Sequence, residues 1–170
     1  EDNYCRFCLP IGQEWSMRHV PYGIHYCGKD PHRHAKAFAE IERLTFLDVG
    51  WGGDVALLRQ HLPETFFNIR LNPVDIQKYT YDELHKNICE RVAASGPDLT
   101  LTGLCCVNMD KAVTDQRIRE IHQVAAEIIN QPPSSDFFDF TLADSQATAG
   151  GPREPKGFDT NRYADYADKL

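Results

Sequence analysis

The sequence lacks the long apolar run that a membrane-spanning helix requires. No stretch approaches the roughly 20 consecutive apolar residues needed to cross a bilayer, and no charged-then-apolar leader opens the chain. The sequence also lacks an excess of basic residues, because 18 Lys and Arg stand against 25 Asp and Glu, for a net charge of −7. A nucleic-acid surface needs clustered cations to neutralise phosphates. We therefore expect neither a membrane segment nor a nucleic-acid partner.

Cysteine spacing bears on the cellular compartment. The six cysteines are at positions 5, 8, 27, 89, 105 and 106. In a secreted protein such a set could form a disulfide framework. Here Cys105 and Cys106 are adjacent within an apolar run, and Cys89 falls inside a helical pattern. This spacing favours a reduced, cytoplasmic compartment in which some of the thiols bind a metal ion.

Four β-like apolar runs alternate with helical patterns. The runs are residues 20–27, 44–49, 65–71 and 99–107. The helical pattern after each run opens at a residue suited to N-capping, namely Asp30, Asp54, Thr80 and Thr114. Strands that alternate with helices at this spacing predict an α/β fold built from parallel βα units. The nearly continuous apolar runs predict strands that are covered on both faces.

The chain divides into two parts by composition. Residues 1–133 contain the four βα units and a leading helix that carries Cys5 and Cys8. Residues 134–170 accumulate Ser, Asp, Gly and Pro and show weak periodicity. We expect an irregular tail or excursion there, with Phe137, Phe138 and Phe140 as candidates to dock on the body.

Metal-ligating side chains occur where the apolar runs end. In a parallel α/β fold these carboxyl ends converge on one edge of the sheet. His25 and Cys27 are two residues apart and point to the same face of a strand, whereas Cys105 and Cys106 point to opposite faces. Only one of that pair can therefore join the site, and the alternation does not say which. One His and two thiolates with an open fourth position are typical of catalytic zinc; the alternative is a buried His among packed thiols.

Four further residues at the same edge are candidates for a role in chemistry. Asp48 either supplies a fourth ligand, orients His25 through its second ring nitrogen, or caps a turn. Trp51 either lines a ligand pocket or belongs to the core. Arg70 either binds an anionic group or makes a structural ion pair, and Asn72 ends the same run as a ligand-binding candidate. The nearby His32 and His34 are expected in solvent.

Five segments carry a resemblance to a known family. They are Glu1–Pro10, Gly23–Gly28, Leu47–Gly52, Asn68–Pro73 and Gly103–Asp110. Together they resemble the uroporphyrinogen decarboxylase-like superfamily, and more narrowly its corrinoid-dependent zinc methyltransferase branch. That branch has a His-x-Cys…Cys zinc motif on the rim of a TIM (β/α)8 barrel, and the interval from Cys27 to Cys105 or Cys106 is similar. The resemblance spans about residues 1–130 and corresponds to the second half of the barrel.

The resemblance implies zinc-dependent methyl transfer between a methylated small molecule or thiol and a corrinoid carried by a partner protein. It also implies a missing half, because a complete barrel takes about 250 residues. A second chain or an amino-terminal half would then close the barrel. Two alternatives stay open: a tetrapyrrole decarboxylase-like enzyme without zinc, and a non-catalytic half-barrel subunit that completes a partner.

Overall fold

The four predicted strands form one parallel sheet. The computed structural model describes residues 3–106 and 111–130, and in it the strands lie in the order β1-β2-β3-β4 with every neighbouring pair parallel. The strands are β1 (Tyr22–His25), β2 (Leu44–Val49), β3 (Phe66–Arg70) and β4 (Thr102–Cys105). Each falls within the apolar run that predicted it. The prediction of an α/β fold with parallel βα units is therefore confirmed.

Helices connect the strands and flank the sheet. They are α1 (Leu9–Arg18), α2 (Ala35–Ala39), α3 (Val55–His61), α4 (Pro73–Lys78), α5 (Tyr81–Ala94) and α6 (Asp115–Asn130). A π-helical turn, Tyr4–Cys8, runs directly into α1 and carries the first two cysteines. The short helix α4 was not predicted. It begins at Pro73, where a fixed φ suits the first helical position, and the Asn72 side chain accepts a hydrogen bond from Val74 N.

One expected cap is wrong. The Asp30 side chain makes no capping hydrogen bond, and its backbone (φ −125°, ψ 54°) lies outside the extended conformation that caps usually adopt. Its carboxylate instead accepts hydrogen bonds from Tyr26 Oη and from Arg33 Nη1, both at 3.2 Å. The expected single helix after it is divided into a 3₁₀ turn, Pro31–His34, and the short α2.

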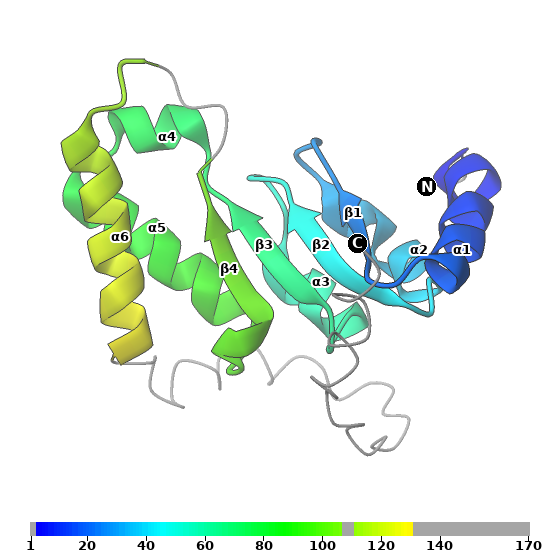
Figure 1. Cartoon of the computed structure of the whole chain (residues 1–170). Coiled ribbons are helices and arrows are strands. Elements are labelled where there is room, and N and C mark those ends of the chain that lie inside the picture. The colour runs from blue at the N-terminus through cyan, green and yellow to red at the C-terminus, as the bar shows by residue number, and fades with distance from the viewer. Residues whose placement is uncertain (1–2, 107–110, 131–170) are drawn as a thin grey trace, which may run out of the picture.

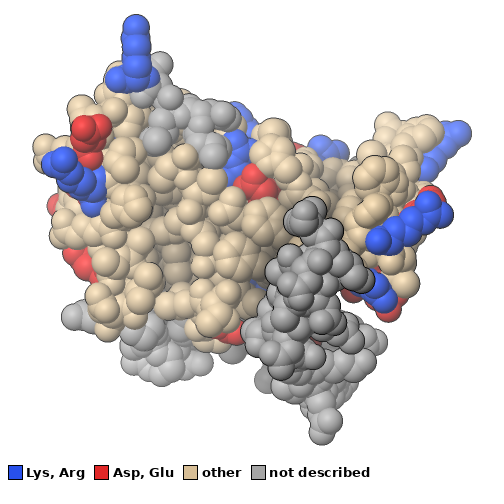
Figure 2. All heavy atoms as spheres, viewed as in Figure 1, with Lys and Arg blue, Asp and Glu red and all other residues tan. Residues whose placement is uncertain are grey.

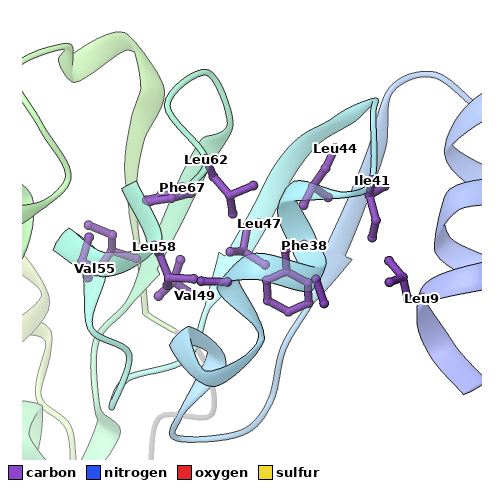
Figure 3. Packing of buried hydrophobic residues seen from close by; sticks show 13 residues of the cluster. Leu9, Phe38, Ile41, Leu44, Leu47, Val49, Val55, Leu58, Leu62 and Phe67 are labelled. Atoms are coloured by element: carbon purple, nitrogen blue, oxygen red, sulfur yellow. The ribbon is translucent and has the colours of Figure 1, made fainter. Parts of the chain in front are cut away.

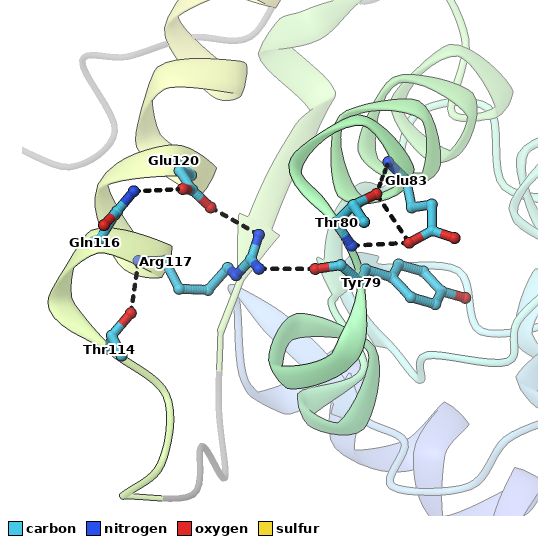
Figure 4. A network of polar contacts seen from close by, with 7 residues as sticks. All are labelled: Tyr79, Thr80, Glu83, Thr114, Gln116, Arg117 and Glu120. Carbon is cyan, nitrogen blue, oxygen red and sulfur yellow. Dashed lines mark hydrogen bonds and ion pairs between the residues drawn. The ribbon is translucent and has the colours of Figure 1, made fainter.

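The other three expected caps are present. Asp54 accepts a hydrogen bond from Leu57 N, and Thr114 accepts one from Arg117 N. Thr80 and Glu83 form a reciprocal capping box, and the hydrogen bonds from Thr80 lower the pKa of the Glu83 carboxyl. Beside this box, Arg117 of α6 donates to Tyr79 O at 2.7 Å, so α6 is tied to the junction of α4 and α5 (Figure 4).

The helices between consecutive strands lie on one face of the sheet. Because strand order follows chain order and βαβ crossovers are right-handed, each connecting helix returns on the same side. In Figure 1, α2, α3 and α5 lie behind the sheet, while the face toward the viewer carries no helix of the described part of the chain. The expectation that the strands are covered on both faces is thus not met within the described residues.

The hydrophobic core lies between the sheet and these helices. Phe38 of α2, Leu58 of α3 and the inward residues Leu47, Val49 and Phe67 pack together and are fully buried (Figure 3). A second cluster joins α4, α5 and α6. Its fully buried members are Leu71, Ile76, Leu84, Ile88 and Val124. The two clusters fix the register of the strands, because a slip of one residue would turn Leu47 and Val49 to the other face.

The opposite, uncovered face carries an aromatic pair. Phe46 of β2 and Phe66 of β3 stack with ring centroids 5.8 Å apart and an interplanar angle of 11°. Gly23 of β1 leaves room for Phe46, because a Cβ there would lie 3.0 Å from its ring. Figure 2 shows that this face is mainly uncharged, with most charged side chains near its margin.

Several sequence predictions fall outside the described residues. They are the end of the fourth run at residue 107, the irregular tail over residues 134–170, and the docking of Phe137, Phe138 and Phe140. Among the described residues, the structure has no helix that is long and apolar enough to cross a membrane.

Candidate functional site

The strand register places the polar residues of the uncovered face in rows. Paired residues on neighbouring parallel strands point to the same face. His25 of β1 pairs with Asp48 of β2, which pairs with Asn68 of β3. Two residues after Asn68, toward the carboxyl end of β3, Arg70 pairs with Cys105 of β4. The sequence alternation that buries Leu47 and Val49 thus turns Asp48 to the opposite face, beside His25.

Asp48 is the centre of this arrangement. The residue is buried, with its side chain 11% exposed, and it accepts a hydrogen bond from His25 Nδ1. It also accepts one from Asn68 Nδ2 at 3.3 Å, and its Oδ1 lies 4.0 Å from Arg70 Nε. Three roles were predicted for Asp48, and these contacts correspond to one of them, the orientation of the His25 ring. A carboxylate on one ring nitrogen fixes the tautomer and leaves the other nitrogen available.

The available nitrogen of His25 faces a thiol. His25 Nε2 lies 2.5 Å from Cys27 Sγ, and both residues are exposed. Tyr26 N donates to Asp48 O at 3.2 Å, so the β1–β2 pairing continues for one residue beyond β1 and positions Cys27. An imidazole nitrogen and a thiol sulfur are both ligands that Zn²⁺ prefers. The predicted His-x-Cys pair is therefore brought together, with a carboxylate behind it.

Arg70 supplies a buried positive charge next to this pair. Its side chain is only 2% exposed, and its Nη1 lies 4.0 Å from Cys27 Sγ. The guanidinium also lies over the Trp51 ring, with Cζ 5.1 Å from the centroid. Arg70 Nε is buried and has no hydrogen-bond partner among the described residues. Of its two predicted roles, the structure displays the ion pair, with Asp48.

The two adjacent cysteines have different surroundings. Cys105 pairs with Arg70 and shares the uncovered face with it. Cys106 packs against the second hydrophobic cluster, and burial raises the pKa of its thiol. The structure does not bring Cys105 to His25, because β2 and β3 lie between their strands, roughly 14 Å along the sheet at about 4.8 Å per strand. Within residues 3–106 and 111–130, no three His, Cys, Asp or Glu side chains are placed to hold a metal ion.

The remaining candidates have structural contacts. Asn72 caps α4 through its side-chain oxygen. His32 Nδ1 accepts a hydrogen bond from Asp54 N at 3.1 Å, at the start of α3. The expectation that His34 is solvated is wrong, because it is buried and its ring lies 4.5 Å from that of Tyr4. The helical turn that begins at Pro31 carries it under the π-helical segment.

Sequence reasoning missed two features of the site. Asn68, which donates to Asp48, lies two residues before Arg70 and so shares its face, a relation that alternation alone would have given. The second feature is the close approach of the loop after β2 to the segment after Cys27, and no sequence pattern indicates it. A Cβ on Gly50 would lie 2.0 Å from Gly28 O, so the loop after β2 presses against the segment that follows Cys27. Only glycine permits this approach.

Comparisons with protein-family models, with curated proteins and with solved structures found no match to this chain. Function is therefore inferred from the site itself. The site consists of an exposed thiol, an imidazole held by a buried carboxylate, and a buried guanidinium, all at the carboxyl edge of a parallel sheet.

The contact between these loops can be tested by substitution. We expect Gly50→Ala to destabilise the protein by about 1–3 kcal/mol, because its new Cβ would meet the backbone oxygen of Gly28. Gly12→Ala is the matched control. Its nearest neighbour is the flexible end of Ile41, at 3.0 Å, and alanine favours the helix. Urea unfolding measures both; equal stability of Gly50→Ala and the unaltered protein would contradict the loop contact.

Proposed function

We propose that this chain binds one Zn²⁺ through His25, Cys27 and Cys105 and takes part in methyl transfer. The methyl group would pass between a methylated small molecule or thiol and a corrinoid carried by a partner protein. The observation that supports this most is the series Asp48–His25–Cys27, in which a carboxylate holds one imidazole nitrogen and the other faces a thiol. Metal-binding histidines typically have this carboxylate partner. The resemblance of the chain to corrinoid-dependent zinc methyltransferases points to the same reaction.

The residues present suit zinc in their chemistry. One imidazole and two thiolates leave a fourth position open, as catalytic zinc sites do. Cys105 is the proposed third ligand because it shares the face of Arg70, whereas the partly buried Cys106 packs against the second hydrophobic cluster. The strands that carry His25 and Cys105 lie roughly 14 Å apart in the structure. The proposal therefore requires that closure of the barrel brings Cys105 to His25 and Cys27.

Each residue of the site has a definite part in the proposal. Bound zinc would lower the pKa of a thiol acceptor or polarise the donor atom of a methylated compound. Asp48 keeps the proton on His25 Nδ1 and fixes the orientation of the ring. Arg70 lies near Cys27 Sγ and Asp48, where its charge offsets the negative charges that thiolate ligands bring. Trp51 covers the Arg70 guanidinium and limits access of water to it.

We also propose that the four βα units are the second half of a TIM barrel. A sheet whose strands follow chain order, with its connecting helices on one face, is the arrangement of such barrels. The rows on the uncovered face resemble the layers of side chains that fill a barrel interior. In this proposal the free edges of β1 and β4 pair with four further strands, from an amino-terminal half or from a second chain.

Elemental analysis tests the zinc ligands. We expect about one zinc per chain, as in a single catalytic site, loss of the metal in Cys27→Ser, and reduced occupancy in Cys105→Ser. Cys106→Ser and Cys8→Ser are matched controls and should keep the metal. Cys106 packs against the second hydrophobic cluster, and Cys8 is exposed on the π-helical turn. Absence of metal from every preparation would contradict the proposal and favour a tetrapyrrole decarboxylase-like enzyme.

Visible absorption tests the open coordination position that methyl transfer requires. In the cobalt-substituted protein, 2-mercaptoethanol should add a sulfur-to-metal charge-transfer band, because a thiolate enters the free position. Ethylene glycol, which has oxygen in place of the sulfur, is the control and should leave the spectrum nearly unchanged. A spectrum that 2-mercaptoethanol does not alter would count against direct thiol binding.

A further inference from the structure

Arg91 links the covered side of the sheet to the loop beside the proposed metal site. It belongs to α5, and its guanidinium reaches the loop that follows β2. Nη1 donates to Trp51 O at 2.8 Å, and Nη2 donates to Gly50 O at 3.4 Å. A planar guanidinium can hold two neighbouring carbonyls at once, which a lysine ammonium cannot do with the same geometry.

These two carbonyls are important hydrogen-bond partners because the Arg91 guanidinium is buried. Burial lowers the pKa of Arg91, and the charge of Asp75 only partly opposes this effect. Its Nε is buried and has no hydrogen-bond partner among the described residues. A buried cation of this kind costs free energy unless its donors are used. The two carbonyl contacts therefore fix the loop and the guanidinium relative to each other.

The loop that Arg91 holds is packed against the segment that follows Cys27. Gly50 approaches Gly28 so closely that a Cβ on it would lie 2.0 Å from Gly28 O. Gly52 approaches Lys29 in the same way, since a Cβ on Gly52 would lie 2.5 Å from Lys29 O. Because Gly28 and Lys29 directly follow Cys27, movement of the loop would move the segment that holds the thiol.

The position of the same loop also affects Arg70. The Trp51 ring, whose backbone carbonyl Arg91 holds, lies over the Arg70 guanidinium. Arg70 in turn lies 4.0 Å from both Cys27 Sγ and Asp48 Oδ1. Two separate routes thus run from Arg91 to the residues around His25.

We propose that Arg91 is a positioning residue for the metal site: it holds the Gly50–Trp51 carbonyls so that Cys27 and Arg70 keep their places around His25. This inference rests on the proposed zinc site as far as metal binding is concerned. Its geometric part, the fixed place of Trp51, can be measured without metal.

The experiment compares Arg91→Met with Arg59→Met in a Trp15→Phe background, where Trp51 is the remaining tryptophan of the two in the sequence. Arg59 is a matched control because it also donates to backbone carbonyls, including those of Thr65 and Leu101 before β3 and β4, at the other edge of the sheet. Acrylamide quenching of the metal-free protein measures the exposure of Trp51. Competition with a chromophoric chelator measures zinc affinity.

We expect Arg91→Met to raise the quenching constant about twofold and to weaken zinc binding by about 10-fold or more, the scale seen when a group that orients a ligand is lost. Folded Arg59→Met should keep both values while losing thermal stability. Arg91→Lys keeps the positive charge but loses the planar guanidinium that donates to two carbonyls, so it should give intermediate values. It replaces Arg91→Met if that variant does not fold.

Two outcomes separate the possible failures. If the parent protein binds no zinc, the proposed function is wrong, and quenching alone decides the role of Arg91. If Arg91→Met, or Arg91→Lys in its place, leaves quenching unchanged, or if Arg59→Met alters it equally, Arg91 is not a positioning residue.

Discussion

The hydrogen bond between Asp48 and His25 is the contact on which the rest of the site depends. It joins β1 to β2 through side chains that the strand register places opposite each other. That register is set on the other face, where Leu47 and Val49 are buried against the helices. Because Asp48 occupies Nδ1, the Nε2 atom of His25 is left facing Cys27. Hydrophobic packing behind the sheet thus decides which imidazole nitrogen is available in front of it.

The one-sided arrangement of the helices explains why the site is open. The helices between consecutive strands return on the same face, so the described part of the chain leaves the opposite face and the free edges of β1 and β4 without a covering element. An uncovered apolar surface with unpaired strand edges favours association with further strands. The proposed half-barrel would meet this requirement, because its second half would supply the further strands.

Much of the fold and part of the site could be predicted from the sequence. Apolar runs and caps gave the strands and the starts of three helices, since both are local signals. Alternation placed His25 and Cys27 on one face, but it could not choose between Cys105 and Cys106, whose distinction depends on pairing with β3. The role of Arg91 left no local signal, because its partners lie about 40 residues away, in the loop after β2.

X-ray absorption at the zinc edge tests most directly whether His25 and Cys27 share a metal ion. The proposal predicts one nitrogen at about 2.0–2.1 Å, two sulfurs at about 2.3 Å and one further light atom. A shell of nitrogen and oxygen alone, or of four sulfurs, would contradict it.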